Sequence, residues 1–277
     1  MKKTLYIPGL LTLVLVCSLV LSGTGQAACR NPNLVRGDGL RITPAAMRIT
    51  PAAMSGGIEI AWFGHSFFQI TSSKGTRIIT DPFGYMGFPM PQVWPHVVTV
   101  GREQGNHNNV GLAHGNPLIL RGMKMWGGEW NEINTTFRDV LIYNVPIHTR
   151  SWRDSLKGTA FVFEMDGLCI LHTGDLGEPF NKDQLNLIGH VDILLVPIGG
   201  RFAMNPENAK KVVEQLKPGI AVPMHYYNNT LVLDSFLDVP YRKRFFESNT
   251  FSASKDTLPP PTEIFIPRVV WYGRDYD

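Results

Sequence analysis

Four histidines and one aspartate of this chain stand in the same kind of place, just after a short apolar stretch of sequence. They are His65, His107, His148, His225 and Asp175. Side chains on loops that leave a strand are held in place by the rigid sheet behind them. Imidazole and carboxylate groups are also the usual nitrogen and oxygen ligands of zinc. One such histidine alone is more often structural, but the repeated pattern favours a metal site.

Alternating apolar residues and turn signals predict the strands that would carry these groups. In the second half, Asn205 and Pro206 have the residue types of an N-cap and a first helical position. We expect an α/β or α+β layered fold in one domain over 58–277. The predicted strands are 58–63, 67–70, 76–80, 97–100, 137–143, 159–164, 168–172, 191–196, 220–222 and 263–271, and the helices are 183–188 and 205–217.

The composition excludes several classes of protein. Hydrophobic residues make up 44% of the 277 positions, which is enough to bury a core and excludes wholesale disorder. Without Lys2 and Lys3 the chain has 24 basic and 23 acidic residues, so nothing electrostatic favours a nucleic-acid partner. Three cysteines are too few for a disulfide scaffold.

The N-terminus has the pattern of a bacterial secretory signal over residues 1–28. Lys2-Lys3 precedes an apolar core at 10–21, which is too short for a bilayer span of about 20 residues. The chain is therefore expected to be exported, either into the periplasm or as a lipoprotein anchored through Cys29. Residues 29–57 then form a linker that contains the heptapeptide Arg-Ile-Thr-Pro-Ala-Ala-Met twice, starting at Arg41 and at Arg48.

Several longer motifs make a family resemblance specific, and they lie in order along residues 58–230. The chain resembles the metallo-β-lactamase superfamily, in particular the metal-dependent hydrolases that include ascorbate-6-phosphate lactonase and the N-acylphosphatidylethanolamine phospholipases. The resemblance implies an αββα sandwich of two mixed β-sheets flanked by helices, with a metal site at one edge. The motifs are Trp62-Phe63-Gly64-His65-Ser66-Phe67-Phe68, Thr80-Asp81-Pro82-Phe83, His172-Thr173-Gly174-Asp175, the run 191–200 and the run 218–225.

The signature loop of that family, His-x-His-x-Asp-His, is degenerate here. Arg102, Gln104 and Asn106 stand at its first three ligand positions, and His107 alone is kept. Arginine stays protonated and has no lone pair to offer a cation, and a neutral amide oxygen is a poor zinc ligand. The loss of two imidazoles predicts that one of the family's two metal positions is gone.

The resemblance assigns roles to the remaining residues. His107, Asp175 and His225 would hold one zinc ion, with His148 as a further ligand. Asp175 and His65 are the candidate catalytic groups, and Arg102 would bind an anionic part of the substrate. Asn106 and His172 would orient the ligands.

Two functions follow from this sequence. The first is an exported hydrolase with a reduced, mononuclear zinc site that cleaves an ester, lactone, amide or phosphodiester in a small-molecule or lipid-like substrate. The second is an inactive relative of the same fold that holds no zinc and serves as a binding or scaffold protein. Contact with a membrane is expected only through the N-terminal signal or a lipid on Cys29.

Overall fold

The computed structural model of the chain describes residue 29 and residues 56–124, 128–149, 156–200, 202–227 and 229–270. The predicted signal peptide at 1–28 and the duplicated heptapeptide of the 29–57 linker lie outside the described residues. Among the residues that are described, no helix is long and apolar enough to cross a membrane.

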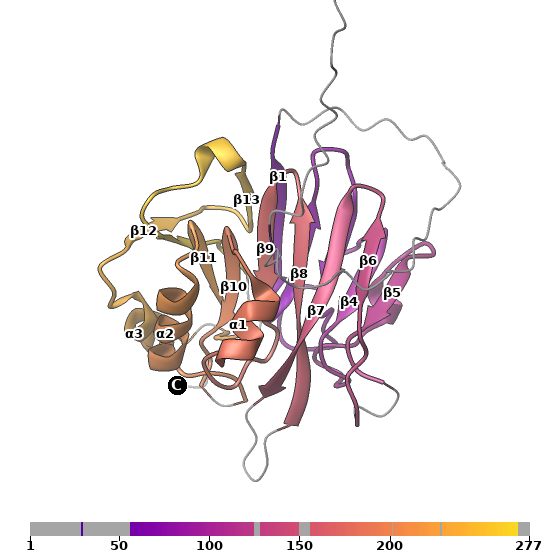
Figure 1. Cartoon of the computed structure of the whole chain (residues 1–277), viewed down its shortest axis with the longest axis horizontal. Coiled ribbons are helices and arrows are strands. Elements are labelled where there is room, and N and C mark those ends of the chain that lie inside the picture. Colours follow the sequence, from indigo (N-terminus) through magenta and orange to yellow (C-terminus); the bar gives the residue numbers. More distant parts are fainter. Residues whose placement is uncertain are drawn as a thin grey trace, which may run out of the picture.

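Two mixed β-sheets form the body of the protein (Figure 1), as the predicted sandwich requires. The six-stranded sheet has the order β13(Thr250–Ala253), β1(Ile58–Gly64), β2(Phe67–Thr71), β3(Arg77–Thr80), β4(Val97–Val100), β5(Leu118–Arg121). The eight-stranded sheet has the order β12(Arg242–Phe245), β14(Glu263–Ile266), β11(Ile220–Met224), β10(Ile193–Pro197), β9(Leu168–His172), β8(Leu156–Met165), β7(Val140–Thr149), β6(Asn134–Phe137).

The inner strands β2, β3 and β4 of the six-stranded sheet bury residues on both of their faces. Phe68 and Ile70 of β2 belong to the main core shared with the eight-stranded sheet, whereas Phe67 belongs to a second apolar cluster. Ile78 and Ile79 of β3 divide in the same way. Because side chains alternate across a strand, the two clusters lie on opposite faces of this sheet.

The helices are distributed less evenly than an αββα sandwich implies. Figure 1 shows α1(Lys182–Ile188), α2(Pro206–Leu216) and α3(Thr230–Leu237) gathered beside β10 and β11 of the eight-stranded sheet. In the described part of the chain, the outer face of the six-stranded sheet is covered by loop residues such as Phe83, Phe88 and Val93, with the 3-10 turn η1(Val110–Leu112). The segment 82–95 contains four prolines and two glycines, which disfavour a helix there.

The structure has strands that the sequence did not predict, namely β5, β12, β13 and nearly all of β6, and the predicted strand 137–143 spans the turn between β6 and β7. The last strand ends at Ile266 rather than at residue 271, because Pro267 follows and cannot donate a ladder hydrogen bond. Helix α3 was not predicted, because its first residues, Thr-Leu-Val-Leu, are apolar and β-branched and so are typical of a strand. Asn229 accepts a hydrogen bond from the backbone N–H of Val232 and so caps this helix.

Cys29 is buried and forms a disulfide with Cys169 of β9. The backbone N–H of His190 donates a hydrogen bond to the Cys29 carbonyl oxygen at 2.8 Å. The sulfur of Cys169 is therefore buried and bonded rather than a free thiol.

Candidate metal centre

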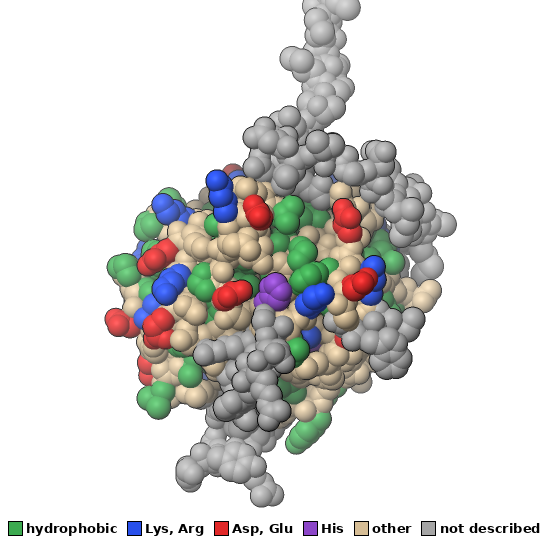
Figure 2. Space-filling view, turned by 60° about the horizontal axis from the view of Figure 1, so that its bottom comes forward, with side chains coloured by type: hydrophobic (Ala, Val, Ile, Leu, Met, Phe, Trp, Pro, Cys, Tyr) green, Lys and Arg blue, Asp and Glu red, His purple; other side chains and the backbone are tan. Residues whose placement is uncertain are grey.

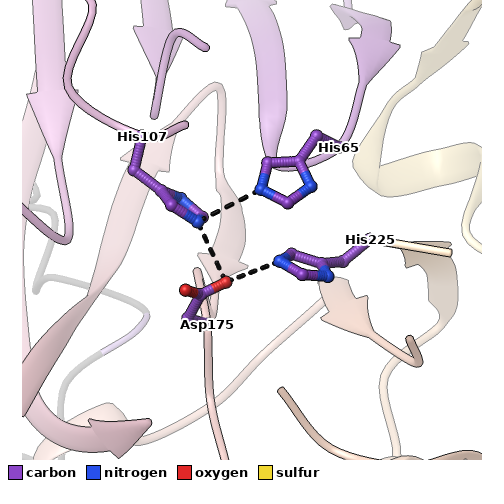
Figure 3. Close-up of side chains that lie close together, drawn as sticks. All are labelled: His65, His107, Asp175 and His225. Atoms are coloured by element: carbon purple, nitrogen blue, oxygen red, sulfur yellow. Dashed lines mark hydrogen bonds and ion pairs between the residues drawn. The ribbon is translucent and has the colours of Figure 1, made fainter. Parts of the chain in front are cut away.

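Four buried side chains converge where strands of both sheets end (Figure 3). His65 follows β1 and His107 lies on the loop after β4, both in the six-stranded sheet. Asp175 follows β9 and His225 follows β11 in the eight-stranded sheet. Each residue is at most 4% exposed, and one ligand atom from each lies within 4.8 Å of the others.

Asp175 contacts His107 and His225, and His107 in turn contacts His65. The Oδ1 atom of Asp175 lies 2.8 Å from Nε2 of His225 and 3.0 Å from Nε2 of His107. Nε2 of His65 lies 3.2 Å from Nε2 of His107. Three nitrogen atoms and one carboxylate oxygen therefore face a common point, as the ligands of a divalent metal do.

Two of these atoms have no hydrogen-bond partner of proper geometry among the described residues. They are Oδ1 of Asp175 and Nε2 of His225, although both are fully shielded from solvent. Leaving a buried polar atom unpaired costs about 1–3 kcal/mol, and native proteins rarely leave one without a reason. The donor set of three imidazole nitrogens and one carboxylate oxygen fits a zinc-like cation.

A second aspartate orients His107. Oδ2 of Asp81 lies 3.0 Å from Nδ1 of His107, and Oδ1 of Asp81 accepts a hydrogen bond from the backbone N–H of Gly101 at 2.6 Å. A carboxylate behind a ligating imidazole fixes its ring and its tautomer. The sequence did not assign this role to Asp81, although its place after β3 resembles that of the other site residues.

Arg102 lies on the other side of Asp175. Its Nη1 donates a hydrogen bond to Oδ2 of Asp175, and the residue is only 6% exposed. The two oxygens of one carboxylate are thus divided between a permanent cation and the histidine group. This places a guanidinium beside the cluster, where the family pattern has an imidazole.

Charges and burial set the protonation of the group. Burial lowers the pKa of His107, but Asp175 and Asp81 raise it more, to about 9. Burial would raise the pKa of Asp175, but His107 and His225 hold it well below its usual value. Burial, with the neighbouring His225 and His107, lowers the pKa of His65 well below its usual value.

The other residues singled out in the sequence lie around this group. Nδ2 of Asn106 is 3.1 Å from Nε2 of His65, and Nε2 of His172 is 2.9 Å from the carbonyl oxygen of Ser66, next to His65. Gln104 is exposed. His148 lies on β7, half-buried, with its ring edge-on to Trp130 at 5.5 Å, and it does not belong to the group of four.

The backbone around the site is strained. Of the seven non-glycine residues with positive φ in the described part of the chain, His65 (50°), Asp81 (39°), His225 (62°) and Tyr227 (53°) are at or beside the cluster. Each such conformation costs of order 1–3 kcal/mol and persists only where packing enforces it. Packing is tight here, because a Cβ added to Gly199 would lie 1.9 Å from the carbonyl oxygen of His225.

Comparisons with known proteins agree with this geometry. A family model described as the β-lactamase superfamily domain matches residues 59–225. A UPF0173 metal-dependent hydrolase of Thermococcus onnurineus is 32% identical over 196 residues, covering 61% of this chain and 84% of that protein. One from Carboxydothermus hydrogenoformans is 30% identical over 193 residues, with the same coverage.

Solved structures support the same assignment. A Thermotoga maritima protein assigned as a Zn-dependent hydrolase of the metallo-β-lactamase superfamily matches with a TM-score of 0.59 and 29% identity, covering 76% of this chain and 100% of that chain. A Parabacteroides distasonis protein assigned as a metal-dependent hydrolase has a TM-score of 0.54 at 16% identity, covering 78% and 96%, and shows the shared fold. The chain belongs to the metallo-β-lactamase superfamily, among its metal-dependent hydrolases.

Proposed function

We propose that the protein is a hydrolase that works with one divalent metal ion, zinc by its ligand set, held by His107, Asp175 and His225. The observation that carries the proposal is the convergence of three buried imidazoles and one buried carboxylate, whose ligand atoms all lie within 4.8 Å of one another. Two imidazoles and one carboxylate leave a position open, as in catalytic zinc sites. When bound, such an ion polarises a substrate oxygen and makes a water molecule more acidic.

His65 is the proposed general base. Its lowered pKa keeps the ring neutral at pH 7. The amide N–H of Asn106 donates to the lone pair of Nε2 of His65, so the attacking water has to replace this hydrogen bond before Nε2 can accept its proton. A neutral imidazole beside the metal ligands can take a proton from the attacking water and return it to the leaving group.

Arg102 supports a count of one metal rather than two. Its guanidinium stands at a position where the family pattern has a ligating histidine, and it already neutralises Oδ2 of Asp175. A second cation there would meet a fixed positive charge with no lone pair. The remaining N–H groups of Arg102 are proposed to bind an anionic part of the substrate.

The bond that is cleaved is proposed to be an ester, lactone, amide or phosphodiester, and the protein is proposed to act after export to the periplasm. Export is supported by the signal-like pattern at 1–28 and by the Cys29–Cys169 disulfide, since disulfides persist mainly in oxidising compartments. On the face in Figure 2, acidic and basic side chains are interspersed, which does not favour a nucleic-acid partner.

Metal content per chain, measured by elemental mass spectrometry on the exported protein, tests the proposal. We expect about one zinc ion per chain, almost none in His225→Ala, and an unchanged content in the control His114→Ala, whose ring is exposed and stacks on Trp94. Thermal unfolding of each variant separates loss of metal from loss of fold. Two ions per chain would contradict the role given to Arg102.

The Arg102–Asp175 ion pair also favours a second candidate, an inactive relative that binds a partner without hydrolysis. An ion pair that occupies the bridging carboxylate can stabilise a site that holds no metal. In that case zinc content stays near zero even after zinc is supplied. The variant Arg102→His, Gln104→His, Asn106→Asp would then create chelator-sensitive hydrolysis, whereas chelator-sensitive activity in the native protein refutes this candidate.

A further inference from the structure

A cavity of about 430 Å³ lies beside the metal centre, and nothing in the proposed mechanism uses it. Its walls come from β1, from the loop that carries Phe88, from the residues after His225, from α3 and from the C-terminal strands. This volume is within the usual range of small-molecule sites. The aromatic residues among its lining include Trp62, Phe88, Tyr226, Tyr227 and Phe245.

The cavity and the metal centre share a wall. The ring of Tyr227 lies 5.8 Å from the ring of His65 and 6.4 Å from that of His225. Phe88 stacks on Tyr227 at 6.0 Å with an interplanar angle of 11°. Phe88 also packs directly on Gly64, where an added Cβ would lie 2.5 Å from its ring. A molecule in the cavity would therefore lie one aromatic side chain away from the metal ligands.

The lining selects for an uncharged aromatic group. Trp62 and Tyr226 are buried and pack on each other with ring centroids 5.5 Å apart, and Tyr227 and Phe245, 39% and 66% exposed, present aromatic surface to the cavity. Aromatic pairs gain about 0.5–1.5 kcal/mol beyond the area they bury. The charged lining residues Glu247 and Arg268 are exposed and 3.5 Å from each other, so they lie at the rim and not in the interior. Phe245 is 66% exposed, which leaves apolar surface uncovered at this site.

We propose that this cavity binds an uncharged aromatic group of the substrate, next to the bond that is cleaved at the metal centre. The inference rests on the proposed hydrolase function, because that function places the scissile bond beside His65 and Asp175. Substrates with an aromatic ring next to the scissile bond are then preferred to alkyl substrates of the same size.

Binding is tested without catalysis, using two ketones that cannot be hydrolysed. Phenylacetone carries an aromatic ring, and 2-nonanone is an alkyl ketone with the same number of carbon atoms. Titrations followed by ligand-observed NMR are done on the zinc-loaded and the EDTA-treated protein. We expect phenylacetone to bind at least tenfold more tightly than 2-nonanone in both forms, because the cavity contains no metal ligand.

Thr230→Trp fills the cavity from an exposed lining position at the first turn of α3. It is expected to weaken phenylacetone binding at least tenfold and to leave zinc content unchanged. Leu231→Trp is the matched control, since Leu231 is 79% exposed, does not line the cavity and receives the same side chain. It should change the affinity less than twofold.

Hydrolysis of methyl phenylacetate and methyl octanoate, which also have equal carbon counts, completes the test. The aromatic ester should have the higher kcat/KM, and Thr230→Trp should remove this preference. Equal binding of the two ketones, or binding unaffected by Thr230→Trp, overturns the inference while zinc content and hydrolysis still support the proposed function. Aromatic binding that depends on Thr230, with no zinc and no hydrolysis, refutes the hydrolase but retains the binding site.

Discussion

Two of the buried aspartates, Asp175 and Asp192, differ in the groups that contact their carboxylate oxygens. Asp192, just before β10, is 3% exposed and fully provided with donors. It accepts hydrogen bonds from the backbone N–H of Cys169 at 2.9 Å and from Lys255 Nζ at 2.8 and 2.9 Å, and His190 Nε2 lies 2.9 Å away. Asp175 has two imidazoles at similar distances, yet its Oδ1 has no partner of proper geometry among the described residues.

The difference separates a structural carboxylate from a functional one. Asp192 helps to hold the segment around the Cys29–Cys169 disulfide, and saturating its oxygens serves that purpose. Asp175 is held on one side by Arg102 and keeps the other oxygen for a ligand. The convergence of buried imidazole and carboxylate atoms therefore points to the metal centre more directly than burial alone.

The largest expected effect comes from Asp175→Asn. The amide keeps the size of the side chain but removes the charge that attracts the metal, and it leaves the buried Arg102 unpaired. Zinc content should fall to near zero, and the metal-free protein should lose about 3–5 kcal/mol of stability, the usual cost of breaking a buried ion pair from one side. Elemental analysis and denaturant unfolding measure both effects, and a variant that keeps one zinc ion per chain would contradict the ligand assignment.

Asp81→Asn comes next. The amide can no longer act as a carboxylate behind His107, so we expect zinc affinity to fall by roughly 10–100-fold, as for other outer hydrogen-bond partners of metal ligands. Competition with a chromophoric chelator measures this affinity. Asp166→Asn is the control, since its carboxylate accepts hydrogen bonds from Ser73 far from the cluster. If the Asp81→Asn variant kept the native zinc affinity, the carboxylate charge behind His107 would not be needed. The hydrogen bond to Gly101 would then be enough to position the loop that carries His107.

The sequence indicated much of the site but not all of it. Strand-end positions pointed to His65, His107, Asp175 and His225, which the fold does bring together. His148 shares that sequence context, but its strand β7 extends to Thr149, so the residue is part of a strand rather than of the loop after it. A position at the end of a strand predicts that a residue lies at the edge of the sheet. Which other residues it contacts there depends on how the strands pack in the fold.

The contributions that sequence patterns missed depend on contacts between distant segments. Asp81 acts through a ring 26 positions away, and Cys29 pairs with a cysteine 140 positions away. The sequence does not show that these two cysteines pair, because pairing requires the fold to bring their Cα atoms close together. In the structure this distance is 5.4 Å. The loss of a metal ligand can be predicted from the sequence with more certainty. Arginine has no lone pair for a cation, so Arg102 is excluded as a ligand in any fold.

Asp192→Asn tests the structural half of the comparison. This substitution weakens one or more hydrogen bonds of Asp192 and its ion pair with Lys255, whose side chain is half exposed. We therefore expect a loss of about 1–3 kcal/mol in the free energy of unfolding. Zinc content and zinc affinity should stay at the native values. Denaturant unfolding of the disulfide-bonded protein measures the loss, and a change in metal content would show that the two aspartates are coupled.

The smallest expected effect is a pH dependence confined to the metal-free protein. The pKa of His107 is raised to about 9 in the folded state, against about 6.5 in an unfolded chain. A raised pKa stabilises the fold fully below pH 6.5, and this contribution is lost as pH rises towards 9. His65 and His172 have lowered pKa values, so both are neutral in the folded and unfolded states above pH 7.5 and do not oppose the trend there.

Between pH 7.5 and 9 the metal-free protein should therefore lose about 1.5 kcal/mol, which corresponds to a fall of roughly 3–6 °C in Tm. The pKa of Asp192 is lowered, so its carboxylate stays ionised across this range and Asp192→Asn should show the same slope. In the zinc-loaded protein the Nε2 proton of His107 is replaced by the metal, and the slope should disappear. Differential scanning calorimetry with and without EDTA measures both curves, and equal slopes would mean that His107 does not bind the ion.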